Sequence, residues 1–124
     1  MRRAVRYGDA WHPNRLRLAW FRDTGIPRLR EIAEREGRPA PALCPRIRLR
    51  LTDAPLDDTQ RIIGEGTLAQ VRHDLEALHN LGCKAILLDT YYDDVEATRY
   101  NETAWRMLTV MAEQALDLPR QTLK

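Results

Sequence analysis

Three short clusters of aromatic, imidazole and carboxylate side chains mark where this chain could carry out chemistry. They are Trp11-His12-Pro13, Thr52-Asp53 and Asp89-Thr90-Tyr91-Tyr92. The indole of Trp11 can stack on a flat heterocycle, and the imidazole of His12 can donate or accept a hydrogen bond. The phenols of Tyr91 and Tyr92, together with the Asp89 carboxylate, have the chemistry to rim a pocket. Each cluster follows a predicted strand, where ligands of βα proteins bind.

Each of these clusters also has an ordinary structural interpretation. Trp11 is equally suited to the core, which would leave His12 on the surface. Thr52-Asp53 fits a simple turn, and the two tyrosines fit a cap over an adjoining hydrophobic layer. The sequence leaves both interpretations open for all three clusters.

A further candidate is the run of residues 46–51, which alternates strictly between arginine and an aliphatic residue. Strands of parallel sheets are covered on both faces and are normally apolar throughout, so Arg46, Arg48 and Arg50 depart from that pattern. Three explanations remain: a solvent-facing or edge strand, an anion-binding cavity lined by one or more arginines, and contact with a partner subunit.

Two segments have features of phosphate sites. Gly64-Glu65-Gly66-Thr67 precedes a helix start and offers backbone donors to an anion, although a hinge before a self-capped helix explains the same residues. Arg2 and Arg3 open the first predicted helix and carry the charge to bind phosphate, or they are simply basic residues at a frayed terminus.

Several function classes are disfavoured by composition and spacing. The 20 basic and 18 acidic residues leave a net charge of +2, which indicates no nucleic-acid partner. The two cysteines and three histidines lack metal-ligand spacing. No apolar run reaches membrane-spanning length and no secretory signal is visible, so we expect a cytoplasmic protein. Without a nucleophile elbow, Ser/His/Asp set or dinucleotide fingerprint, no residue is assigned a catalytic role.

Helix and strand patterns alternate along the chain, which predicts an α/β fold with a mostly parallel sheet in a single domain, residues 1–124. Thr67 and Gln70 form a capping box, and in the last helix Trp105, Leu108, Ala112 and Ala115 are expected on the packed face. The predicted helices span residues 2–7, 15–22, 27–36, 67–82 and 98–118, and the predicted strands span 9–12, 46–51 and 85–88.

Motifs along nearly the whole chain resemble the luciferase-like flavin- and deazaflavin-dependent monooxygenases and oxidoreductases. Gly82-Cys83-Lys84, before the apolar run 85–88, is similar to the turn into the eighth strand of that family's barrel. The start of the chain resembles the arginine-alanine helix and the G-D-G-W turn, with Ala10 in place of glycine, and Gly64 to Val71 resembles the entry to the seventh helix.

The resemblance implies a TIM-barrel family whose members bind FMN or the deazaflavin coenzyme and transfer a hydride or oxygenate a substrate. It places Arg2 and Arg3 beside the cofactor phosphate, as cofactor-binding residues. It places Trp11 and His12 near the substrate and cofactor cavity, and Tyr91 and Tyr92 at the mouth after the last strand. The fold implied is a partial (βα) barrel of about three parallel strands, corresponding to the last strands of a TIM barrel.

Because the motifs begin at Met1, we expect a truncated or split enzyme that is inactive alone. A partial barrel exposes sheet edges and an apolar inner face, so we expect a homodimer or higher oligomer, or pairing with a separate chain that supplies the N-terminal half of the barrel. The alternative is a noncatalytic oligomeric α/β interaction module.

Overall fold

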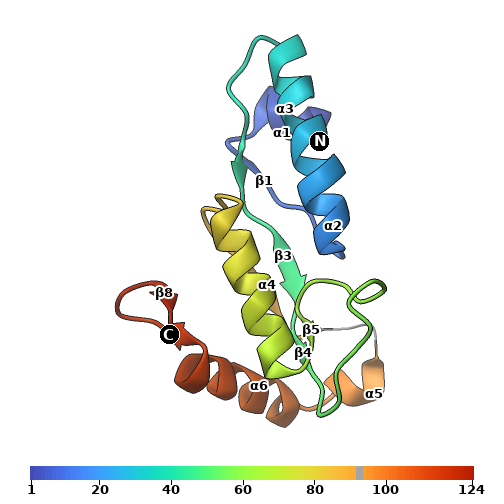
Figure 1. The fold of residues 1–124 in the computed structure, drawn as a ribbon, viewed down its shortest axis with the longest axis vertical. Coiled ribbons are helices and arrows are strands. Elements are labelled where there is room, and N and C mark those ends of the chain that lie inside the picture. The colour runs from blue at the N-terminus through green and yellow to red at the C-terminus, as the bar shows by residue number, and fades with distance from the viewer. Residues whose placement is uncertain (92–93) are drawn as a thin grey trace.

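The computed structural model describes residues 1–91 and 94–124 and shows a mixed α/β chain of helices and short parallel strands (Figure 1). Within these residues the strands do not close into a barrel. In chain order the elements are α1 (Arg2–Tyr7), β1 (Ala10–Trp11), α2 (Leu18–Trp20), the π-turn η1 (Phe21–Gly25), α3 (Ile26–Arg35), β2 (Ala42–Leu43), β3 (Arg46–Arg48), β4 (Arg50–Leu51), β5 (Glu65–Gly66), α4 (Leu68–Asn80), β6 (Leu87–Asp89), α5 (Val95–Thr98), α6 (Asn101–Gln114), β7 (Leu116–Asp117) and β8 (Thr122–Leu123).

The central feature of the described chain is a segment, residues 42–52, with parallel neighbours on both edges. On one edge β2 pairs with β1, and the bridge between Asn14 and Arg46 extends this ladder. Further along the same edge β4 pairs with β5. On the other edge β3 pairs with β6. The order across the sheet is therefore 9–14, 42–52 and 84–89, with helices in the connections.

The register separates the two faces of this sheet. Directly opposed residues in a sheet share a face, so Asn14, Arg46 and Leu87 form one row, and Arg48 and Asp89 form the next. The odd-numbered residues of the central segment point to the other face, where Leu43, Pro45, Ile47 and Leu49 are buried and Leu51 is partly buried. We call the face that carries Arg46 and Arg48 the open face, and the face that carries Ile47 and Leu49 the helix face.

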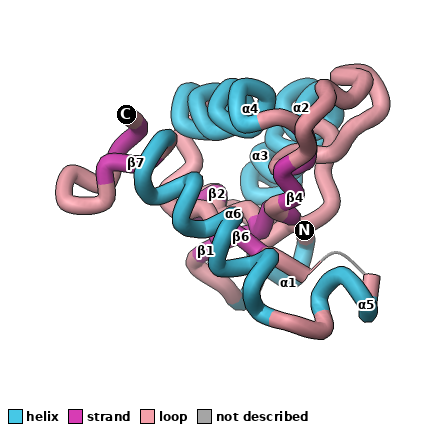
Figure 2. The backbone as a smooth tube through the Cα atoms, turned by 90° about the horizontal axis from the view of Figure 1, so that it is seen from below, coloured by secondary structure: helices cyan, strands magenta, loops and turns pink. Residues whose placement is uncertain are grey.

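In Figure 2, α2, α3 and α4 lie together on one side of the strands. Apolar spacing of three and four residues gives each long helix a buried stripe, with Leu29 and Ala33 on α3. On α4 the stripe is Val71, Leu75 and Leu78. These side chains join the strand residues in one hydrophobic core.

Local signals position the two long helices of this layer as the sequence predicts. The Thr67 side chain accepts from the Gln70 N–H and the Gln70 side chain accepts from the Thr67 N–H, so the capping box is confirmed and α4 begins at Leu68. The predicted helix 27–36 is confirmed as α3, with Pro27 in its first turn. Gly37 follows it with φ +61, a left-handed conformation that glycine adopts without strain.

The helix predicted over residues 15–22 is wrong at its start. Arg15 has φ +52, which no right-handed helix accommodates, and α2 begins three residues later at Leu18. A π-turn, Phe21–Gly25, then joins α2 to α3. The chain leaves β1 at the strand end and must turn before Phe21 can reach the core beside Trp11, so tertiary packing overrides the helical pattern.

The single helix predicted over residues 98–118 is also wrong. The structure has α5, α6 and then the antiparallel hairpin of β7 and β8. On α6 the buried residues are Met107 and Met111. Of the predicted packed face, Trp105 is 68% exposed, whereas Ala115 is buried and Leu108 and Ala112 are partly buried. Two apolar stripes compete on this helix, and the sulfur of Met107 accepts from the Leu51 N–H at 3.4 Å, which selects the methionine stripe.

Among the described residues, no helix combines the length and the apolar character needed to cross a lipid bilayer.

Candidate functional site at the strand ends

A cavity of about 220 Å³ lies on the open face of the sheet, near the carboxyl ends of its strands. It draws residues from all three parallel segments, which is the arrangement that places ligand sites in βα proteins. Arginine supplies half of its lining residues. The lining is Asn14, Arg15, Arg46, Arg48, Asp89 and Tyr91.

Arg46 and Asp89 form the ion pair that links two of these strands. Both Nε and Nη2 of Arg46 donate to Oδ2 of Asp89, at 2.9 and 2.6 Å. The other oxygen, Oδ1, accepts from the Tyr91 N–H at 3.1 Å, so Asp89 also shapes the chain after β6. Arg46 is 43% exposed and Asp89 20%, which leaves the pair within reach of solvent.

Arg48 lies deeper, and Glu65 is its partner. The Nε of Arg48 donates to Oε1 of Glu65 at 2.9 Å, with side chains 16% and 13% exposed. The close approach of β5 to the central segment depends on Gly64, which has φ +93. A Cβ on Gly64 would lie 2.5 Å from the Arg48 carbonyl oxygen, so only glycine fits there.

Arg15 enters the cavity from the turn after β1. Its left-handed backbone, φ +52, is uncommon for a residue with a Cβ and costs free energy that the surrounding structure must offset. The bridge between Asn14 and Arg46 anchors the preceding residue to the central segment. The strain therefore coincides with a residue that lines the cavity.

The first predicted cluster does not supply an exposed aromatic surface. Trp11 is 8% exposed, and its ring lies 5.8 Å from that of Phe21 in the core. His12 is exposed on the open face, with Nδ1 2.7 Å from the Cys44 carbonyl oxygen. Of the two interpretations of this cluster, the structure matches the packed tryptophan with a surface histidine.

Arg2 and Arg3, the residues that the resemblance assigns to the cofactor phosphate, are not among those lining the cavity. Arg2 donates through Nε to Oε1 of Glu36 at 2.9 Å, at the end of α3, and Arg3 is exposed. Hydrogen bonds from Arg6 and Arg2 lower the pKa of the Glu36 carboxyl. In Figure 1, α1 and the end of α3 lie at one end of the molecule, away from β3.

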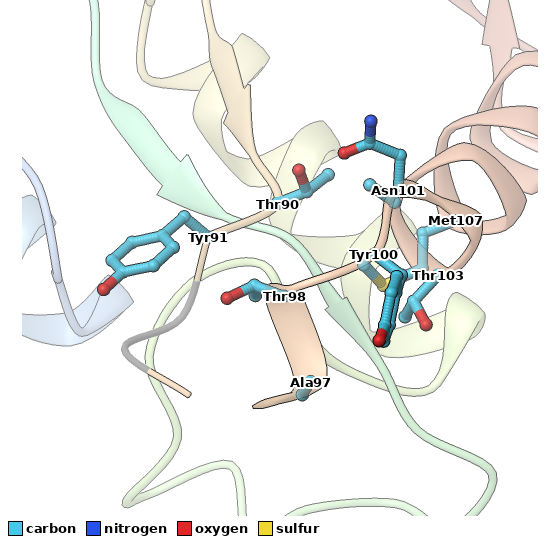
Figure 3. A pocket seen from close by; sticks show the side chains of 9 residues that line it. Thr90, Tyr91, Ala97, Thr98, Tyr100, Asn101, Thr103 and Met107 are labelled. Atoms are coloured by element: carbon cyan, nitrogen blue, oxygen red, sulfur yellow. The ribbon is translucent and has the colours of Figure 1, made fainter. Parts of the chain in front are cut away.

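Tyr91 is where the sequence predicted it, at the mouth after the last strand, whereas Tyr92 lies outside the described residues. Tyr91 lines the arginine cavity and also a smaller pocket of about 100 Å³ between the end of β6 and α5 and α6. Figure 3 shows its ring directed away from Thr90, Tyr100 and Asn101, which also line the smaller pocket. Tyr91 therefore separates the two hollows.

The glycine loop predicted as a possible anion site is occupied by the chain's own groups. The Gly64 N–H donates to Oδ2 of Asp74 at 2.9 Å, and the Thr67 N–H donates to the Gln70 side chain. Arg61 donates twice to Asp74, at 2.6 and 2.9 Å. The self-capped helix is therefore the interpretation that the structure matches. We call Arg61, Gly64 and Asp74 the loop clamp.

Sequence reasoning missed the loop clamp, because its members are 10 and 13 residues apart and follow no motif. Arg61 and Asp74 are only 7% and 1% exposed. The hydrogen bonds that Arg61 donates to Asp74 raise the pKa of the Arg61 guanidinium, and the hydrogen bond that Arg61 donates to Asp58 lowers the pKa of the Asp58 carboxyl. The available signal was Asp74 itself, an acidic residue at a buried position in the amphipathic pattern of α4.

A larger groove of about 570 Å³ runs between α4, the segment before β6 and the C-terminal hairpin. Cys83 lies in it, and burial raises the pKa of its thiol to about 11, with a smaller contribution from Cys44. A thiol with this pKa is a poor nucleophile near neutrality. Within the described residues, no group of three or more His, Cys, Asp and Glu side chains is placed to hold a metal ion.

No protein-family model, no curated protein and no solved structure matches this chain.

Proposed function

We propose that this chain is the C-terminal portion of a luciferase-like βα barrel, part of a flavin- or deazaflavin-dependent oxidoreductase whose active site is completed by another chain. The observation that carries the proposal is the sheet itself. Its parallel strands follow one another in chain order, its aliphatic face packs into the core with the helices, and its arginine face is only partly buried. Sheets of this kind are normally covered on both sides.

The described residues fit only part of such a cofactor. The arginine cavity has the charge and size for an anionic group, but the packed face of Trp11 offers no surface for an isoalloxazine ring. We therefore assign no catalytic residue and derive no reaction step for this chain alone. The ring-binding surface would come from the partner, either a second copy or a separate chain with the N-terminal strands.

Fluorescence titration with FMN and with the deazaflavin coenzyme tests this proposal. We expect weak, saturable quenching with a Kd of about 1 mM, which corresponds to about 4 kcal/mol of binding free energy. Riboflavin is the matched control, because it carries the ring system without the phosphate. Absence of any saturable signal with either cofactor contradicts the cofactor-binding part of the proposal.

The second candidate is a noncatalytic oligomeric α/β interaction module, and exposed apolar side chains favour it. Tyr100 and Trp105 near α6 and Leu118 beyond it are each more than 60% exposed. Large exposed apolar groups mark association surfaces when they lie together. Light scattering across micromolar concentrations separates the outcomes. An oligomer that binds neither cofactor supports the module, and a monomer contradicts the module and also an active site completed by a second copy.

A further inference from the structure

The arginine cavity has features of a ligand site that do not depend on any flavin. Three arginines from two different segments line one hollow of about 220 Å³, with Asp89 as the carboxylate among the lining residues that the structure describes. Guanidinium groups recognise oxyanions through paired N–H donors in a fixed plane. Gathering several of them in one concave site costs free energy through mutual repulsion, which the carboxylates of Asp89 and Glu65 offset for Arg46 and Arg48.

Contacts within the chain hold Arg46 and Arg48 in place. Asp89 holds the Arg46 side chain, and Glu65 holds Nε of Arg48. Both contacts join residues on the open face of neighbouring strands, so the sheet fixes their spacing. Side chains that are already ordered lose less conformational entropy when a ligand binds.

The neutral groups in the lining complete the donor set. The Asn14 side chain carries an amide and Tyr91 carries a phenol, and both are exposed at the cavity. The volume is several times the roughly 30 Å³ that one water molecule occupies in the liquid, so a tetrahedral oxyanion fits without rearrangement. A small planar carboxylate would use fewer of these donors.

We propose that this cavity binds a phosphate group, either as inorganic phosphate or at the end of a phosphate monoester, with Arg15, Arg46 and Arg48 as its cationic ligands. Asp89 is the internal competitor, because its carboxylate already accepts from Arg46. Phosphate carries close to two negative charges at neutral pH and outcompetes a carboxylate for several arginines. The site is a single hollow, unlike the extended basic stripe of a nucleic-acid surface.

A titration followed by NMR of the arginine Nε–H signals tests the proposal, with inorganic phosphate, glycerol phosphate and acetate as separate probes at constant ionic strength. We expect saturable shifts of the Arg46 and Arg48 signals with both phosphate probes and much weaker shifts with acetate. Preference for glycerol phosphate over inorganic phosphate identifies a monoester site, and the reverse preference identifies a site for free phosphate. Equal affinity for acetate overturns the assignment to phosphate.

Three variants are expected to differ in how they change phosphate affinity. Arg46→Gln is expected to weaken phosphate binding about tenfold, through loss of a charge-assisted pair. Asp89→Asn is expected to strengthen it about threefold, because the competing charge is removed while Oδ1 can still accept from the Tyr91 N–H. Arg50→Gln is the matched control, since Arg50 lies on the same segment but is exposed and does not line the cavity.

The Asp89→Asn variant separates a ligand site from a structural ion pair. If the pair only stabilises the sheet, this variant leaves phosphate affinity unchanged or lowers it, and the proposal is overturned. Arg15→Gln provides a second loss-of-charge variant outside the strands, with circular dichroism to confirm folding. None of these probes contains an isoalloxazine ring, so phosphate binding and cofactor binding can fail independently.

Discussion

The loop clamp and the arginine cavity both pair arginine with carboxylate near the strand ends, yet they are arranged differently. In the loop clamp, Asp74 accepts from two guanidinium nitrogens and from the Gly64 N–H, and it is almost fully buried. In the cavity, Arg46 is half-exposed, and two of its guanidinium nitrogens donate to the same oxygen of Asp89.

This difference shows how burial separates structural from ligand-binding arginines. A buried ion pair has its charges neutralised within the fold, and an incoming anion would have to break it at a high desolvation cost. A solvent-accessible ion pair contributes little to stability, and its arginine can exchange the carboxylate for another anion. We therefore expect the loop clamp to control stability and the cavity to control binding.

Removing the acid of the loop clamp is expected to have the largest effect. Asp74→Ala leaves the Arg61 charge and the Gly64 N–H without their buried acceptor, and should lower the free energy of unfolding by about 3–5 kcal/mol. Urea denaturation followed by circular dichroism measures this change. Glu31→Gln is the control, because the exposed pair of Glu31 and Arg35 should contribute less than about 0.5 kcal/mol. Equal losses for the two variants would show that burial does not make the loop clamp more stabilising than an exposed ion pair.

The glycine between the two sites gives the next largest effect. Gly64→Ala places a Cβ 2.5 Å from the Arg48 carbonyl oxygen at φ +93, so we expect a loss of about 2 kcal/mol or more in thermal or urea unfolding. Gly37→Ala is the matched control, since it also has positive φ but has no heavy atom within 4 Å of the added Cβ. It should cost about 1 kcal/mol. A Gly64 variant no weaker than the Gly37 variant would show that the contact is tolerated.

Within the cavity, the stability effect should be small. Arg46→Gln removes a half-exposed ion pair, so unfolding in urea should change by less than about 1 kcal/mol while phosphate affinity falls. A loss of stability as large as that of Asp74→Ala would show that Arg46 belongs with the structural arginines.

The smallest expected effect on stability comes from the half-buried thiol of Cys83. Its pKa is raised from 9.0 to about 11 in the folded chain, so between these values the folded state holds a proton that the unfolded state has lost. The stabilising contribution is thus complete below about pH 9 and is lost as the pH rises toward 11. Urea unfolding at several pH values should show a steeper decline for the natural chain than for Cys83→Ala. Parallel curves would show that the groove does not shield this thiol.

Short-range signals predicted much of the helix face. The capping box of Thr67 and the left-handed stop at Gly37 act within a few residues, so no knowledge of the rest of the chain is needed to place α3 and α4. The alternation of residues 46–51 predicted a strand with one aliphatic and one arginine face, and the structure confirms it as β3 and β4. The barrel resemblance, the cofactors and the oligomeric state remain predictions.

The candidate site was predicted only in part. Asp89 and Tyr91 follow a recognisable strand, but nothing near Arg15 in the sequence indicates that it lies beside them. Arg46 and Asp89 are 43 residues apart, and their contact depends on the parallel register of β3 and β6. The α6 helix carries two competing apolar stripes, and only its docking against Leu51 selects Met107 over Trp105.

By itself, the sequence determined the helix boundaries that local caps specify and the alternation that gives the central segment two different faces. Tertiary structure decided which arginines gather at the strand ends and which are neutralised in the loop clamp. The physical reason is range: caps and periodicity involve neighbours in the chain, whereas strand register and buried ion pairs depend on segments brought together by burial of the helix face.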